Sequence, residues 1–221
     1  MLDIRQEVHG IVIKHSPVGD YDRIVTILTA EKGKINAFAR GVRRMGARLS
    51  GSLEPLSLGS FFLYTRKNSY TINEVKINEY FEGLKQDLKK VSYASFFLEL
   101  TDYYNHENIE AADYLNLLYI SLRAIDSGEE RFSYELVRCA FEIRSIVIDG
   151  TFPGALNVGA DLEGTRAAIK YITSSELRKI FSFRLEDEAF KDLKRVTRAL
   201  RNKFVDKRLN SLEMLGMYEE I

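Results

Sequence analysis

The chain has 221 residues, of which 45% are hydrophobic and 29% charged, so it can bury one large core or two smaller ones. Its single cysteine excludes an internal disulfide and a multi-cysteine metal site, and fits a reducing cytosol. The first residues include acids and no apolar segment, which argues against a secretory signal. No window approaches about 18 uncharged apolar residues, so no membrane span is expected.

The zero net charge hides a partition along the chain. Residues 1–80 hold 12 basic and 8 acidic side chains, a net charge of +4. Residues 81–150 hold 7 and 13, a net of −6, and residues 151–221 hold 13 and 11, a net of +2. Because screening at physiological salt acts over about 8–10 Å, a ligand responds to local charge rather than to the total. Polyanions therefore stay among the possible partners.

Five short strands are predicted before residue 80, each rich in β-branched or alternating residues and bounded by turn residues. Their expected ranges are 7–15, 21–30, 35–40, 58–66 and 70–78. Lys32-Gly33-Lys34 is expected to be the hairpin tip between the second and third strands. Five strands in one short segment predict a sandwich or a closed barrel, and five-stranded OB-type barrels commonly bind single-stranded nucleic acid.

Near residue 80 the hydrophobic period changes from that of strands to that of helices. Helices are expected over residues 81–104, 111–125, 132–148, 174–183 and 187–209. The glycine-rich stretch 149–163 is expected to be a loop. We therefore predict a multi-domain α+β chain: a five-stranded OB-fold barrel over residues 1–80, followed by an α-helical domain over residues 81–221 that contains a loop region at 149–172.

A basic run in the predicted barrel is the strongest functional feature. Between residues 32 and 48 the chain has six basic side chains and no acidic one, and such self-repelling charge is typical of a polyanion-binding surface. Nearby glycines let the backbone approach phosphates, and arginine offers planar paired donors. The alternative is a solvated loop that only aids solubility. We favour nucleic-acid contact by Lys32, Lys34, Arg40, Arg43, Arg44 and Arg48.

Aromatic side chains of the predicted barrel can stack on bases, which is worth about 1–3 kcal/mol per base. Phe61 and Phe62 are adjacent in one strand, so one of them must face the core. Tyr64 and Tyr70 are the pair that we expect to be exposed and to contact nucleic acid.

The last long helix carries a second concentration of basic residues, eight between residues 189 and 210 against two aspartates. Five of them follow i, i+3, i+4 spacing and form a stripe beside the apolar face: Lys191, Lys194, Arg195, Arg198 and Arg201. A solvated helix face, a second polyanion surface and a docking site for an acidic partner are the alternatives for this stripe.

Few residues point to catalysis or to a cofactor. The three histidines are scattered without metal-ligand spacing, and neither phosphate-binding nor nucleophile-elbow motifs occur. Asp20 and Asp22 flank Tyr21 and are more typical of a turn than of a catalytic pair. Cys139 lies among apolar helix residues and is expected to be buried and inert. The chain is therefore expected to bind rather than to react.

Residues 10–44, GIVIKHSPVGDYDRIVTILTAEKGKINAFARGVRR, and residues 47–58, ARLSGSLEPLSL, resemble the RecO family of bacterial recombination mediators. The helical stretch EYFEGLKQDLKKVSYASFFLEL, residues 79–100, extends the resemblance. It is carried by V-G-x-Y-D-R-I, a G-K-I hairpin, G-x-R-R and L-E-P in that order. Beyond residue 100 the resemblance is that of a helical domain ending in a basic helix.

The resemblance implies an OB fold followed by a helical domain, in a cytoplasmic, nucleoid-associated protein of DNA repair and recombination. Such proteins bind single- and double-stranded DNA, anneal complementary strands without ATP, and help to load recombinase onto gaps, together with RecR and the single-stranded-DNA-binding protein. The basic run would contact DNA, and basic residues of the last long helix would receive that protein's acidic tail. The alternatives are a non-catalytic protein–protein adaptor that docks acidic partners and, third, a nuclease.

One departure from the family is clear from the sequence. Many members carry a four-cysteine zinc ribbon between the helices, whereas residues 149–176 contain neither cysteine nor histidine. Zinc is therefore excluded there, and the loop is expected to be held by packing. Partner contacts made through the ribbon in relatives are put in doubt for this chain.

Overall fold

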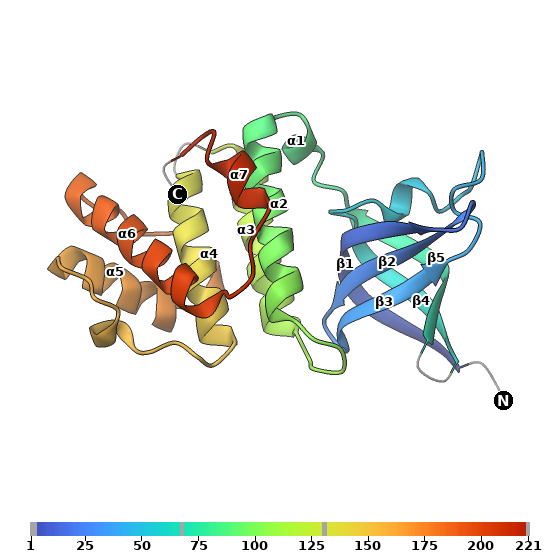
Figure 1. The fold of residues 1–221 in the computed structure, drawn as a ribbon, viewed down its shortest axis with the longest axis horizontal. Helices are drawn as coiled ribbons and strands as arrows, with labels where there is room; N and C mark the ends of the chain where they lie inside the picture. The colour runs from blue at the N-terminus through green and yellow to red at the C-terminus, as the bar shows by residue number, and fades with distance from the viewer. Residues whose placement is uncertain (1–3, 67–68, 130–131, 220–221) are drawn as a thin grey trace. The chain divides into compact units, whose positions relative to one another are not determined.

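The computed structural model spans the chain and describes all residues except 1–3, 67–68, 130–131 and 220–221 (Figure 1). It divides into two compact units: residues 1–81 with 101–115, and residues 82–100 with 116–221. The sequence placed a boundary at residue 80 and did not group 101–115 with the strands. No helix of the described ranges is both long and apolar enough to cross a bilayer.

The first unit is built on a closed five-stranded barrel, as predicted, with the strand order β1-β2-β3-β5-β4. All neighbouring strands are antiparallel except β3 and β5, which run parallel. The hairpin tip lies slightly earlier than expected, because Gly33 and Lys34 already belong to β3. The strands are β1 (Ile4–Val18), β2 (Asp22–Thr29), β3 (Gly33–Ala39), β4 (Leu58–Arg66) and β5 (Ser69–Glu79).

Alternation along the strands fills the barrel with apolar side chains. On β3, Ile35, Ala37 and Ala39 are almost fully buried, while the residues between them face outward. On β4, Phe61 is fully buried and Phe62 is not, so Phe61 is the member of the pair that faces the core. Burial of each large apolar side chain contributes about 1.5–3 kcal/mol, which makes this alternation the main determinant of the register.

Residues 105–111 cover the β2–β3 hairpin inside the first unit. The backbone N–H of Lys34 donates to the carbonyl of His106 (3.1 Å), and that of Asn108 donates to the carbonyl of Lys32 (2.9 Å). Gly33 has φ +64°, and a Cβ there would come within 2.2 Å of the His106 carbonyl oxygen. Glycine is therefore required at this hairpin for steric as well as conformational reasons.

The helices α1 to α4 occupy the expected regions, with one break. Residues 81–104 were expected to form one helix, but they form two, α1 and α2, with a break at residues 86–87. At the start of α2, the carboxylate of Asp87 accepts the backbone N–H of Lys89 (2.8 Å). Such capping favours a new helix start over a continuous helix. The four helices are α1 (Glu82–Lys85), α2 (Leu88–Tyr104), α3 (Ala112–Ser127) and α4 (Tyr134–Ile148).

The chain between residues 149 and 187 differs from the prediction. Helix α5 (Glu163–Ser174) lies partly in the expected loop region, and the helix expected over 174–183 is only a 3₁₀ turn, Leu177–Lys179. At the end of α5, the hydroxyl of Ser174 donates to the carbonyl of Lys170 (2.7 Å), and the next residue, Ser175, has an extended backbone. Serines compete for backbone hydrogen bonds in this way and end helices. The remaining helices are α6 (Asp187–Phe204), shorter than expected, and α7 (Ser211–Leu215).

Candidate nucleic-acid interface

Residues 40–48, which we call the arginine loop, follow β3 and are fastened to the β1–β2 turn. The carboxylate of Asp22 accepts the backbone N–H of Gly41 (2.7 Å), and the carbonyl of Tyr21 accepts the N–H of Arg43 (2.9 Å). The Arg43 guanidinium donates to the carbonyl of Gly19 (3.0 Å). Asp22 therefore anchors the loop, which agrees with the turn interpretation of the two aspartates.

The anchored loop presents its cations to solvent. Its four arginines are exposed, and none has a carboxylate partner within the described part of the chain: Arg40, Arg43, Arg44 and Arg48. The Arg44 guanidinium lies over the ring of Tyr21, 5.1 Å from its centroid, and Tyr21 itself is 53% exposed. Unpaired guanidinium groups held on a fixed backbone form a site suited to phosphates.

Glu54, the glutamate of the L-E-P motif, fixes the chain that returns from the arginine loop to the barrel. Its carboxylate lies 2.7 Å from the guanidinium of Arg23 and 3.0 Å from Nε2 of His15. Burial alone would raise the pKa of Glu54, but hydrogen bonds and charge from Arg23 and His15 hold it below its usual value. Polar contacts thus attach the chain to the barrel at the start of the arginine loop and again at Glu54, six residues after its end.

The basic run does not form one surface, because β3 separates its members. Lys32 and Lys34 lie at the start of the strand and Arg40 at its end, roughly 20 Å away at about 3.3 Å per strand residue. The ammonium of Lys34 lies 3.1 Å from the carboxylate of Asp102, which also pairs with Lys14 at 2.7 Å. Burial would raise the pKa of Asp102, and these two lysines hold it low. Lys34 is therefore engaged within the fold, and Lys32 is half-buried.

The two tyrosines chosen from the sequence lie in different environments. Tyr64 faces outward and is 36% exposed, whereas Tyr70 belongs to the barrel core and is only 7% exposed. Burial, with Glu107 nearby, raises the pKa of Tyr70. The expected exposure of Tyr70 is wrong because residue 70 occupies an inward position of β5. Phe38, which is 38% exposed, was among the barrel aromatics but was not chosen, although Ala37 and Ala39 facing inward require it to point outward.

The stripe on α6 is largely neutralised by acids of the same unit. Lys194 lies 2.7 Å from Glu135, and Arg201 is buried with its guanidinium 3.2 Å from Glu142. The guanidinium of Arg195 pairs with Asp192 and Asp161 at 2.6 and 2.8 Å. The two members that are exposed and lack an acidic partner among the described residues are Lys191 and Arg198.

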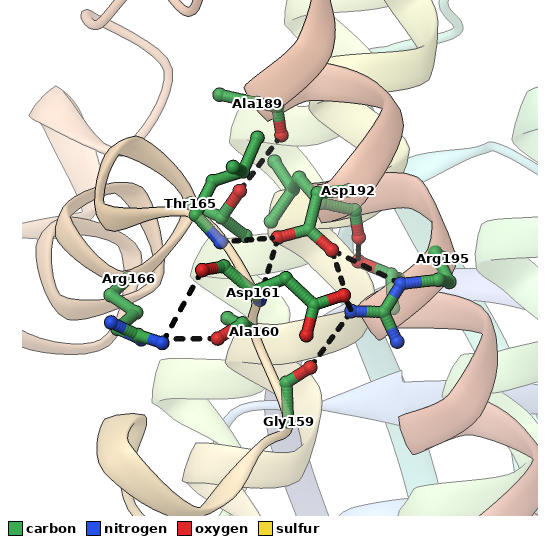
Figure 2. Close-up of polar contacts among 11 residues, drawn as sticks. Gly159, Ala160, Asp161, Thr165, Arg166, Ala189, Asp192 and Arg195 are labelled. Carbon is green, nitrogen blue, oxygen red and sulfur yellow. Dashed lines mark hydrogen bonds and ion pairs between the residues drawn. The ribbon is translucent and has the colours of Figure 1, made fainter.

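Asp192 holds the loop before α5 against α6, as Figure 2 shows. Its carboxylate accepts the backbone N–H groups of Asp161 (3.0 Å) and Leu162 (3.1 Å), and it is also bound by Arg195, which donates further to the carbonyl of Gly159 (2.8 Å). Burial would raise the pKa of Asp192, but these donors keep it below its usual value. The loop is held by a polar cluster in addition to the packing that the sequence led us to expect.

Charged groups are also buried between α4, α6 and the end of the chain. The guanidinium of Arg138 pairs with Glu142 and, at 2.6 Å, with Glu219, and Arg201 completes the cluster through Glu142. The neighbouring Cys139 is fully buried, as predicted, and burial raises the pKa of its thiol to about 11. A thiol that is neutral at pH 7 and shielded from solvent is a poor nucleophile.

Sequence reasoning missed a pocket of about 580 Å³ in the helical unit. Its wall includes Phe132 and Phe181, whose rings meet edge to face at 6.3 Å, and three arginines also line it: Arg123, Arg178 and Arg184. The segment 177–184 supplies six of the thirteen lining residues, and all of them except Arg184 fall within the helix predicted over 174–183. Because that segment is mostly non-helical, its side chains do not follow the helical spacing from which a shared face is recognised.

A closed barrel with an anchored basic loop, followed by a helical unit, defines an OB-fold protein with an appended helical domain. Residues 2–81 match the family model described as Recombination protein O N terminal, and residues 85–153 match Recombination protein O C terminal. The chain belongs to the RecO family.

Curated relatives agree with this assignment over nearly the whole length. The chain is similar to the DNA repair protein RecO of Acetivibrio thermocellus, with 28% identity over 96% of both chains. It is also 26% identical to the protein of the same name from Clostridium perfringens, over 97% of this chain and 98% of the relative. A third, from Alkaliphilus metalliredigens, is 31% identical over 66% of this chain and 59% of the relative.

Proposed function

We propose that this protein is a DNA-binding recombination mediator that binds single- and double-stranded DNA through the arginine loop. It anneals complementary strands and helps to load recombinase onto gaps coated by the single-stranded-DNA-binding protein, without ATP and without breaking bonds. Membership of a family of DNA repair proteins supports this role. The observation that carries the DNA-binding part is the set of four exposed arginines without acidic partners in the described chain, on a loop whose start is fixed by Asp22 and whose return to the barrel is fixed by Glu54.

Annealing requires charge neutralisation rather than catalysis. Two strands repel each other through their phosphates, and a protein that offsets this charge lets complementary bases meet. Each neutralised phosphate releases counterions, so the logarithm of the affinity falls with the logarithm of salt by about 0.7 per contact on a single strand and about 0.9 on a duplex. Four contacts from the arginine loop predict a slope of about −3 for single strands.

The test is fluorescence-anisotropy titration of a labelled single-stranded oligonucleotide over a salt series. Replacing Arg43 and Arg44 by alanine should weaken binding and flatten the slope by about 1.4. The matched control replaces Lys191 and Arg198, two exposed cations of α6, and should leave the slope unchanged. A wild-type slope in the Arg43→Ala/Arg44→Ala variant would remove the arginine loop from the interface.

Annealing is measured separately with two labelled complementary oligonucleotides in the absence of ATP. The wild-type protein should accelerate pairing, and the Arg43→Ala/Arg44→Ala variant should lose most of that acceleration at physiological salt. If neither protein accelerates pairing although the wild type binds DNA, the proposed function is limited to DNA binding without annealing.

We also propose RecR and the acidic tail of the single-stranded-DNA-binding protein as partners. The proposal of RecR rests on family membership alone. For the acidic tail, the sequence proposed five cations of α6, and two of these, Lys191 and Arg198, have no acidic partner among the described residues. The aromatic pocket with Arg178 and Arg184 offers both apolar walls and cations, so we favour it. Binding of an acidic peptide with apolar side chains should weaken in Arg178→Ala/Arg184→Ala and not in Lys191→Ala/Arg198→Ala; the reverse would assign the tail to α6.

The pocket also keeps the adaptor as a second candidate function. A protein–protein adaptor would bind the acidic peptide tightly and oligonucleotides negligibly, even at low salt. The anisotropy experiment separates the two functions directly. In either case we propose a cytoplasmic protein, associated with the nucleoid if DNA is the ligand.

A further inference from the structure

We propose that the outer face of β3, β5 and β4 is a track for a short single strand of nucleic acid, which meets the arginine loop at Arg40. Two bases stack on Phe38 and Tyr64, and the phosphates on either side contact Arg40 and Arg66. We call these four residues the strand track. The inference rests on the proposed function, since it concerns how the same barrel holds DNA.

The strand register places the two rings in one row. Phe38 on β3 and Tyr64 on β4 both pair with Thr71 of β5, one from each side. Phe38 is 38% exposed and Tyr64 36%. Phe38 stands outward between buried Ala37 and Ala39, and Tyr64 stands outward after buried Leu63. Two strand spacings put their backbones about 10 Å apart. Thr71 is small, so no large side chain of β5 stands at the register position between the two rings.

Strand direction then places a cation at each end of this row. Arg66 follows Tyr64 by two residues on β4 and therefore shares its outward face. Arg40 follows Phe38 by two residues, directly after the end of β3, and is exposed. Because β3 is parallel to β5 and β4 is antiparallel to it, the two arginines lie on opposite sides of the row. The result is a diagonal order of cation, ring, ring and cation across three strands.

The charge of this face matches a polyanion. Arg40 and Arg66 are both exposed, and neither has a carboxylate partner among the residues that the structure describes. Of the two glutamates of β5, Glu74 pairs with Arg5 at 3.4 Å, and Glu79 is the last residue of the strand. Arg40 is also the first residue of the arginine loop, so a strand leaving the track at that end would continue onto the loop.

The chemistry selects a single strand over a duplex. An aromatic side chain stacks on the face of a base, and that face is accessible only when the base is unstacked from its neighbours. A duplex presents its phosphates to the arginine loop but keeps its base faces inside the helix. The strand track therefore adds affinity for single strands alone, without sequence preference, because every base has a stacking face.

The first test compares single- and double-stranded oligonucleotides by anisotropy. The Phe38→Ala/Tyr64→Ala variant should bind the single strand at least about 30-fold more weakly, since each stacked base is worth about 1–3 kcal/mol. Binding of the duplex should change less than about twofold, and the salt slope should stay the same because no phosphate contact is lost. Phe38→Tyr/Tyr64→Phe keeps both rings and should bind like the wild type.

The outcomes separate this inference from the proposed function. Unchanged single-strand binding by Phe38→Ala/Tyr64→Ala, or an equal loss for single strand and duplex, would overturn the strand track while DNA binding stands. Failure of the wild-type protein to bind either DNA would overturn the proposed function itself. Because both side chains are exposed, the thermal unfolding of the variant should match that of the wild type, which excludes misfolding as the cause of a loss.

The second test uses the absence of tryptophan from the chain. Phe38→Trp creates a single fluorophore in the row, and stacking on a base should quench it saturably when a single-stranded oligonucleotide is added. Tyr119→Trp, at a position of the helical unit that is also 38% exposed, is the matched control and should not respond. No quenching of the Phe38→Trp variant, equal quenching of both variants, or quenching by an acidic peptide instead of DNA would overturn the inference.

Discussion

The arginine loop and the α6 stripe look alike in sequence and differ in structure. Both are basic: the stripe lies among eight cations in 22 residues, and the loop ends a run of six cations in 17 residues. In the loop, the four arginines are exposed and lack acidic partners within the described chain. In the stripe, Lys194, Arg195 and Arg201 are each held by a carboxylate. Only the first arrangement leaves most of its charge available to a ligand.

The difference comes from acids that are distant in sequence. Glu135 and Glu142 reach α6 from α4, and Asp161 reaches it from the loop before α5. Near the arginine loop, Asp22 accepts a backbone N–H instead of a guanidinium. A count of basic residues along a helix therefore does not distinguish cations that bind a ligand from cations that join helices. The distinction depends on which acids the tertiary fold brings within about 4 Å.

The largest expected effect separates two arginines of the same stripe. Arg201→Ala removes a buried member of the cluster around Glu142 and leaves that carboxylate with Arg138 alone. We expect a loss of about 3 kcal/mol in the free energy of unfolding, because breaking a buried ion pair leaves charge undercompensated. Urea denaturation measures it.

Arg198→Ala is the matched control, one turn away on the same helix and exposed. Its free energy of unfolding should stay within about 0.5 kcal/mol of the wild type. If the two variants were equally stable, the buried cluster would not stabilise the helical unit, and Arg201 would return to the candidates for partner binding.

The second prediction concerns Asp192, whose carboxylate fastens the loop before α5 (Figure 2). Asp192→Asn keeps the size of the side chain but replaces one acceptor oxygen of the carboxylate by an NH₂ group. The two backbone N–H donors and Arg195 then share a single acceptor oxygen. At pH 7 we expect a loss of about 2 kcal/mol in unfolding free energy, the cost typical of buried donors left without a charged acceptor.

The pH dependence of this variant follows from the lowered pKa of Asp192. A carboxylate with a depressed folded-state pKa stabilises the fold above its unfolded value, about 3.9, and loses this contribution as the pH falls through the folded value. The stability difference between wild type and Asp192→Asn should therefore be largest near neutrality and shrink below about pH 4. A difference that is constant down to pH 3 would show that charge on Asp192 is not what holds the loop.

The sequence predicted the parts of this molecule that depend on local pattern. Alternation located all five strands and the inward position of Phe61, and the V-G-x-Y-D-R-I stretch identified the family. It did not predict α5, whose apolar face is small and follows a glycine-rich loop, or the inward position of Tyr70. It also treated residues 32–48 as one surface, since nothing local reveals that Asp102 meets Lys34 or that five further residues of β3 separate that lysine from the loop.

The smallest expected effect on stability tests whether the arginine loop must be ordered to act. Asp22→Ala removes the acceptor for the Gly41 N–H (2.7 Å) and should cost about 1 kcal/mol of unfolding free energy. Removing a negative charge near the loop would by itself strengthen DNA binding, whereas loosening the loop would weaken it. We expect the second effect to be larger, so that Asp22→Ala binds DNA more weakly than the wild type in the anisotropy assay.

Asp22→Asn separates charge from order, because its amide oxygen still accepts the Gly41 N–H. That variant should bind DNA at least as tightly as the wild type, since it loses only the repulsive charge. If both Asp22 variants bind more tightly, the loop acts through its charge alone and its anchoring is irrelevant to affinity. If Asp22→Ala weakens binding and Asp22→Asn does not, the difference between the loop and the stripe is one of fixed geometry as well as of free charge.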